Sequence, residues 1–117
     1  PGFVWQNAAA FKVTAEIERP LETADDADRE VARRLPVVTA RLSNTSELPQ
    51  ALPILEMKLL DAAGETLAQR VLEPADYGFG GRDAVAPGAD VAVRLTVTTP
   101  LPYDASSAVV KAVSALQ

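Results

Sequence analysis

The chain has 117 residues, a net charge of −5 and a pI near 4.6. A chain of this length buries roughly two thirds of its unfolded surface, so one domain over residues 1–117 needs no disulfide to fold. The negative charge repels phosphate backbones and anionic lipid head groups, and we expect no binding to nucleic acid. The sequence contains neither cysteine nor histidine, which excludes thiol and imidazole catalysis and the metal sites built on those ligands. We therefore predict a protein that is not an enzyme and holds no cofactor or metal.

The first ten residues have no clear period and include the aromatic pair Phe3 and Trp5. We interpret residues 1–10 as an edge strand or as the end of a linker. The strict alternation of apolar and polar residues over 11–18 then predicts a strand. Because the chain begins at Pro1 instead of methionine, we expect a piece of a longer protein, with any membrane anchor upstream.

The acidic segment over residues 24–34 permits two interpretations. Thr23 and Asp26 have the spacing of a capping box, and Arg33 and Arg34 suit the end of a helix. The segment nevertheless has few apolar residues, and we favour a long solvated loop. Its four acids, at positions 25, 26, 28 and 30, lack the spacing of a calcium loop, so we predict no metal here.

Residues 35–43 alternate again and predict a strand, and the segment that begins at Asn44 is expected to turn the chain. Asn44-Thr45-Ser46 satisfies the N-glycosylation pattern, but an asparagine in a turn commonly bonds the backbone two residues on. We prefer the turn interpretation.

The segment between Pro53 and Pro74 predicts a β-hairpin around which the rest is organised. Its first arm places Leu55, Met57 and Leu59 on one face, and residues 61–65 form the turn. The return arm is expected to place Leu67 and Val71 inward.

Residues 75–88 are rich in glycine and predict an irregular loop that ends in a turn at Pro87-Gly88. Residues 90–98 alternate strictly and predict a strand. The segment 106–116 fits both a helical stripe and a strand, and its valines favour a strand.

Short strands separated by turn signals every ten or so residues predict an all-β fold. We expect an antiparallel immunoglobulin/fibronectin-like β-sandwich of about seven strands, because two sheets can cover each other's apolar faces.

At this point the residues resemble a known family, the bacterial domain-of-unknown-function family 3426. The resemblance spans about residues 37–97 and includes the strand ending at Asn44 and the Pro87-Gly88 turn. It also includes a hairpin pattern formed by Pro53, Leu55, Leu59, Asp61, Gly64, Arg70, Pro74 and Tyr77. It implies an all-β domain on the periplasmic side of the bacterial inner membrane, tethered by an upstream transmembrane helix that usually follows a zinc ribbon. The family has no established catalytic residues to transfer.

Aromatic residues are the candidate binding positions, namely Tyr77, Phe79 and Trp5. Tyr77 and Phe79 lie in a glycine-rich loop, where exposed rings commonly contact partners. Tyr77 can alternatively fold back and cap the sheet through its hydroxyl. We expect a non-catalytic structural or protein-interaction module of the bacterial envelope with a protein partner, using loop aromatics or a free sheet edge. The alternative is a module that binds a small ligand or carbohydrate on these rings and Tyr103.

Overall fold

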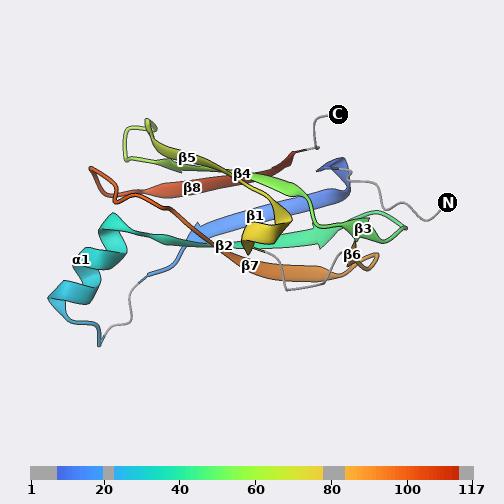
Figure 1. Ribbon diagram of the computed structural model, residues 1–117, viewed down its shortest axis with the longest axis horizontal. Coiled ribbons are helices and arrows are strands. Elements are labelled where there is room, and N and C mark those ends of the chain that lie inside the picture. Colours follow the sequence, from blue (N-terminus) through green and yellow to red (C-terminus); the bar gives the residue numbers. More distant parts are fainter. Residues whose placement is uncertain (1–7, 20–22, 78–83, 114–117) are drawn as a thin grey trace.

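The computed structural model describes residues 8–19, 23–77 and 84–113. In these residues the elements are η1 (Ala8–Ala10), β1 (Phe11–Ile17), α1 (Asp26–Arg34), β2 (Val37–Asn44), β3 (Gln50–Ala51), β4 (Ile54–Leu60), β5 (Thr66–Leu72), α2 (Pro74–Tyr77), β6 (Ala84–Val85), β7 (Asp90–Thr96) and β8 (Ser107–Val113). The strands form antiparallel sheets in the orders β1-β2-β7, β5-β4-β8 and β3-β6. Figure 1 shows the two three-stranded sheets as two layers, with α1 at one end. The mostly β, antiparallel prediction is confirmed, and the short strands β3 and β6 bring the described strands to eight.

The central strands of the two larger sheets, β2 and β4, supply the most deeply buried side chains. Val38, Ala40 and Leu42 of β2 are completely buried, as are Leu55 and Leu59 of β4. Burying each leucine stabilises the fold by roughly 1.5–3 kcal/mol. The period-two pattern predicted for these strands is therefore confirmed. Both rows of side chains belong to one hydrophobic core, which holds the two layers together.

The hairpin β4–β5 forms as predicted. Asp61 organises its turn, since Oδ1 accepts hydrogen bonds from the backbone N–H groups of Ala63 and Glu65 at 2.9 Å. Gly64 adopts a φ of 85°, which glycine reaches without a steric penalty.

One inward position of the return arm was predicted wrongly. Val71 is 57% exposed, and its neighbour Leu72 is buried instead. The register shifts between Leu59 and Leu60, so a bulge interrupts the simple alternation that extends from Leu67.

The last segment is a strand, as favoured by its valines. β8 pairs with β4 from Ser107 opposite Leu60 to Val113 opposite Ile54. Val110 is buried opposite Met57, whereas Val109 lies on the exposed face.

The acidic segment is a helix, so the favoured loop interpretation is wrong. The cap is Asp25 and not Thr23, because Oδ1 of Asp25 accepts from the N–H of Asp28 at 2.8 Å. Glu30 pairs with Arg33 and Arg34 one turn on. None of the residues in α1 is buried, so capping and charge pairs substitute for an apolar stripe.

The predicted irregular loop over residues 75–88 contains short regular pieces. The single turn α2 begins at Pro74, and β6 pairs with β3. The predicted turn at Pro87-Gly88 is present, with Gly88 at a φ of 75°. At the N-terminal end, η1 occupies residues 8–10, and the rest of the predicted edge strand or linker lies outside the described residues.

Candidate binding site

The two larger sheets leave two lateral sides between them, and these sides are built differently. On one side the outer strands are β5 and β7, which we name the β5/β7 side. There α2 contacts both strands and lies across the gap between the sheets (Figure 1). The Arg70 guanidinium of β5 also donates to the Thr96 carbonyl of β7 at 2.6 Å. This side is therefore closed.

Tyr77 is the principal side chain of that closure. It is 8% exposed and packs in the core, and its hydroxyl donates a hydrogen bond to the carbonyl of Pro53. Burial raises the pKa of Tyr77, so the hydroxyl remains a donor at neutral pH. In this position the ring caps the sheet and is not presented to a partner.

The other proposed aromatic positions do not assemble into a site in the described residues. Phe79 and Trp5 both lie outside those residues. Tyr103, in the loop between β7 and β8, is 69% exposed, whereas Tyr77 is buried. The two rings therefore do not form one stacking surface for a carbohydrate.

The opposite side, with β1 and β8 as outer strands, is here named the β1/β8 side. β1 lies beside β8, but in the described residues each pairs with one other strand, β1 with β2 and β8 with β4. The two strands run close together along this side, so each lies against the edge of the other although no ladder joins them in the described residues.

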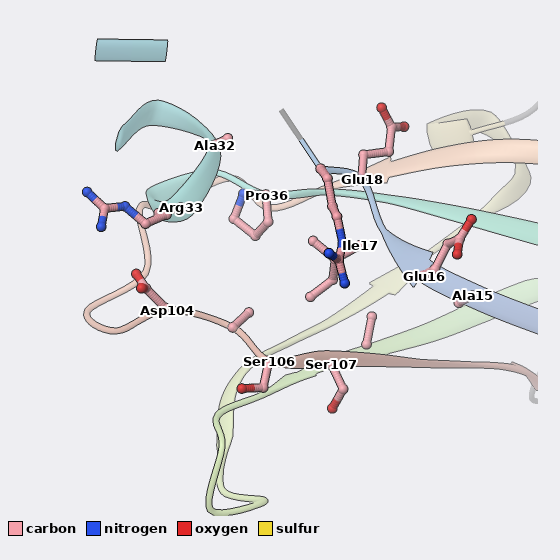
Figure 2. A pocket seen from close by; sticks show the side chains of 13 residues that line it. Ala15, Glu16, Ile17, Glu18, Ala32, Arg33, Pro36, Asp104, Ser106 and Ser107 are labelled. Atoms are coloured by element: carbon pink, nitrogen blue, oxygen red, sulfur yellow. The ribbon is translucent and has the colours of Figure 1, made fainter. Parts of the chain in front are cut away.

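A cavity of about 490 Å³ opens at the end of this side nearest α1. Figure 2 shows how β1, the end of α1 and the segment before β8 surround it. The apolar part of its wall consists of small or half-buried residues, namely Ala15, Ile17, Ala32, Pro36, Ala105 and Ala108. A volume in the roughly 300–1,000 Å³ range is typical of ligand pockets, so the β1/β8 side can receive an occupant.

Charged side chains from separate elements line the same cavity: Glu16, Glu18, Arg19, Arg33 and Asp104. Glu18 already has partners, since it accepts from Arg94 at 2.9 and 3.1 Å and from the Thr39 hydroxyl at 2.8 Å. These hydrogen bonds, the Arg94 bonds most strongly, lower the pKa of Glu18 and keep it ionised. Arg33 likewise pairs with Glu30.

Sequence reasoning did not find this cavity, because its residues come from segments up to about ninety positions apart in the chain. The only local signal is the run of small residues Ala105-Ser106-Ser107-Ala108, which leaves space beside β8. The chemistry that the site offers is a wall of small apolar side chains with carboxylate and guanidinium groups around it.

Asn44 is a structural residue that the sequence identified only in part. Its Oδ1 accepts from the N–H of Ser46 at 2.9 Å, as expected for an asparagine in a turn. Its amide nitrogen also donates to the carbonyls of Leu48 and Val85, both at 2.9 Å. Since the residue is 1% exposed, the glycosylation pattern has no accessible amide.

The acidic segment provides the cap of α1 through Asp25. Across residues 8–19, 23–77 and 84–113, no three acidic side chains are grouped as metal ligands. The helices in the same part of the chain are also too short and too polar to cross a membrane.

A comparison with known protein families shows to which family the chain belongs. The family described as a protein of unknown function, DUF3426, matches residues 21–107, well over half of the chain. The chain belongs to the DUF3426 family. Neither a curated protein nor a solved structure matches it.

Several DUF3426 positions that the sequence presented as a pattern have a common location in the structure. Pro53 and Tyr77 form the hydroxyl–carbonyl hydrogen bond, and Arg70 bridges β5 to β7. The hairpin pattern therefore lies largely on the closed β5/β7 side and at the turn of the hairpin, whereas the family match over residues 21–107 also includes Asp104 of the cavity.

Proposed function

We propose that this domain is a non-catalytic protein-interaction module of the bacterial cell envelope. It is displayed on the periplasmic side of the inner membrane by an anchor outside these 117 residues. The location rests on the usual setting of the family, after a zinc ribbon and one membrane helix. The binding role rests on the β1/β8 side, where a cavity of about 490 Å³ opens at the end nearest α1.

The strand order supports an immunoglobulin-like sandwich as the scaffold of this module. β2 pairs with β1 on one side and with β7 on the other, while β4 pairs with β5 and β8. When the two-residue strands β3 and β6 are left out of the count, β4 is the third strand, β7 the fifth and β8 the sixth. In the immunoglobulin fold the first, second and fifth strands similarly share one sheet, opposite the third and sixth. Such a scaffold holds its outer strands in fixed positions, which suits recognition of an extended segment.

The absence of catalysis is supported by residue chemistry. The sequence has neither histidine nor cysteine for general base or nucleophilic work near neutral pH. In the cavity, the pKa of Glu18 is lowered, opposite to the direction needed for a carboxylic acid that donates a proton.

The cysteine-free sequence allows a direct test of the interaction role. Ser107 is exposed and lines the cavity, so Ser107→Cys carries a photo-crosslinker at the proposed interface. Ala62 is also exposed, in the β4–β5 turn, and Ala62→Cys is the matched control. Both variants are made in the full-length protein and irradiated in the intact envelope of the bacterium that produces it.

We expect a discrete envelope-protein adduct from position 107 and none from position 62. Equal labelling from both positions, or none from position 107, contradicts the proposal.

A further inference from the structure

Large apolar side chains are exposed at the end of the domain where the cavity opens. Val31 is exposed on α1, Leu35 at the C-cap of the same helix, and Tyr103 in the loop before β8. Each of the three is the chain neighbour of a residue that lines the cavity. Exposed apolar surface beside a pocket is typical of a site that contacts a partner. We name these three residues and the cavity together the α1 end.

The cavity provides this surface with a place to anchor a partner's side chain. Its apolar wall includes Ala15 and Ile17 of β1 and Ala108 of β8. β1 and β8 lie against each other, so a partner reaches this wall from the α1 end and does not pair with either strand. Small apolar residues leave room for the aliphatic stem of a long side chain whose polar head stays at the mouth of the cavity.

The rim, defined as the charged side chains that line the cavity, favours a basic occupant. Glu18 and Arg33 already have ion-pair partners. In the described residues Glu16, Asp104 and Arg19 have none, so two carboxylates stand against one guanidinium. The rim is therefore net negative, on a chain whose net charge is −5. Figure 2 shows Glu16 and Asp104 on opposite sides of the cavity.

Tyr103 favours arginine over lysine as the basic side chain. It directly precedes Asp104, so an exposed aromatic ring and a carboxylate are neighbours in the chain. A guanidinium stacks on an aromatic ring and also bonds a carboxylate through two N–H groups, whereas an ammonium is a strongly hydrated point charge. The hydroxyl groups of Ser106 and Ser107, on the same wall, can accept further N–H donors.

We infer that the α1 end binds a short segment of a partner protein in which an arginine stands between apolar residues. The stem of the arginine lies against the alanines of the cavity, and its guanidinium meets Asp104 and Tyr103. The apolar residues on either side cover Val31 and Leu35. This inference rests on the proposed function and specifies the chemistry of the partner.

The test uses N-acetylated tripeptide amides and the purified 117-residue chain. The probe is leucine–arginine–leucine. In the comparison peptides the arginine is replaced by lysine or by citrulline, which keeps the shape and loses the charge, or both leucines are replaced by glycine. NMR titration gives the Kd and locates the shifted amides. We expect the probe to shift amides of residues 31–36 and 103–108, the citrulline peptide to bind at least about tenfold more weakly, and the other two at least about threefold more weakly.

Variants of the protein identify the groups that recognise the arginine. Asp104→Asn should weaken the probe at least about fivefold, because it removes the charge of the acceptor. Glu65→Gln is the matched control, since it removes one carboxylate at an exposed position outside the cavity, and it should change the Kd by less than about twofold. Tyr103→Ala should weaken the probe about threefold through the lost stacking. Its control is Leu48→Ala, which removes an exposed apolar side chain elsewhere.

Filling the cavity tests the anchor separately. Ala108→Leu places a larger side chain on the wall and should abolish probe binding while the protein stays folded, as thermal unfolding shows. If this variant does not fold, the exposed positions Tyr103 and Asp104 decide the question.

Equal affinity for the arginine and citrulline peptides overturns the inference. Equal weakening by Asp104→Asn and Glu65→Gln means a general charge effect and does the same, as do shifts confined to residues away from the α1 end or the absence of any probe binding. If Ser107→Cys still crosslinks an envelope protein in that case, the proposed function stands and only the arginine inference fails.

Discussion

The β5/β7 side and the β1/β8 side are two solutions to the same problem at the edges of two stacked sheets. On the first, a helical turn, a tyrosine and an arginine bridge cover the gap. On the second, the strands lie beside each other without pairing, and a cavity remains. The comparison teaches that the side chains that close the sandwich gather on one side, whereas the side proposed for binding keeps a cavity.

The same separation appears in the family resemblance. Pro53, Arg70 and Tyr77 belong to the pattern that marks the family, and all three act in closing the β5/β7 side. Glu16 and Asp104, on the rim of the cavity, are not positions of the hairpin pattern, although Asp104 lies within the family match over residues 21–107. The side proposed for binding is thus separate from the part of the scaffold that carries the hairpin pattern.

The largest expected effect is the loss of Tyr77. Tyr77→Ala removes a buried ring and leaves the Pro53 carbonyl without its hydroxyl donor, so we expect the free energy of unfolding to fall by about 3–5 kcal/mol. Tyr77→Phe keeps the ring and should cost about 1–3 kcal/mol. Chemical denaturation measures both changes.

Tyr103 is the matched control for this substitution, because it is 69% exposed. Tyr103→Ala should change the unfolding free energy by less than about 0.5 kcal/mol. If Tyr77→Ala proved as harmless as Tyr103→Ala, the β5/β7 side would not be the stabilising side.

A smaller effect is expected from the bridge between β5 and β7. Arg70→Met retains most of the aliphatic stem and removes the donor to the Thr96 carbonyl, which should lower the free energy of unfolding by about 1 kcal/mol. Arg41→Met is the control, since Arg41 is exposed and lies 3.9 Å from Asp90, and its change should be within about 0.5 kcal/mol. Thermal unfolding of the two variants compares them. Equal Tm values would mean that the hydrogen bond from Arg70 to the Thr96 carbonyl does not stabilise the β5/β7 side.

The strands could be predicted because their signal is local. In β2, the residues Val38, Ala40 and Leu42 alternate with polar residues, and each proves completely buried. A sheet with one buried face imposes this period on the sequence directly. Val71 was misplaced because a bulge at Leu67, in the same strand β5, leaves no trace in the alternation itself.

The helix and the cavity were missed for different physical reasons. α1 buries no residue, so the apolar stripe that identifies most helices is absent, and its stability depends on Asp25 and on the charge pairs of Glu30. The cavity depends on how β1, α1 and the segment before β8 are juxtaposed. Tertiary packing creates that arrangement, and no short motif encodes it.

The smallest expected effect concerns Glu18, which links the charged rim to the outer face of the β1-β2-β7 sheet. The Arg94 and Thr39 hydrogen bonds lower the pKa of Glu18 in the folded protein below the ordinary value of 4.5. The stabilisation by this carboxylate is therefore fully present above pH 4.5 and is lost as the pH falls through the lower, folded pKa. Glu18→Gln should unfold at a slightly lower Tm than the wild type at pH 7, and the difference should shrink as the solution is acidified below 4.5. Glu65→Gln, in the exposed β4–β5 turn, should show no such convergence, and a Tm difference for Glu18→Gln that stayed constant with pH would mean that the ion pair with Arg94 adds nothing to stability.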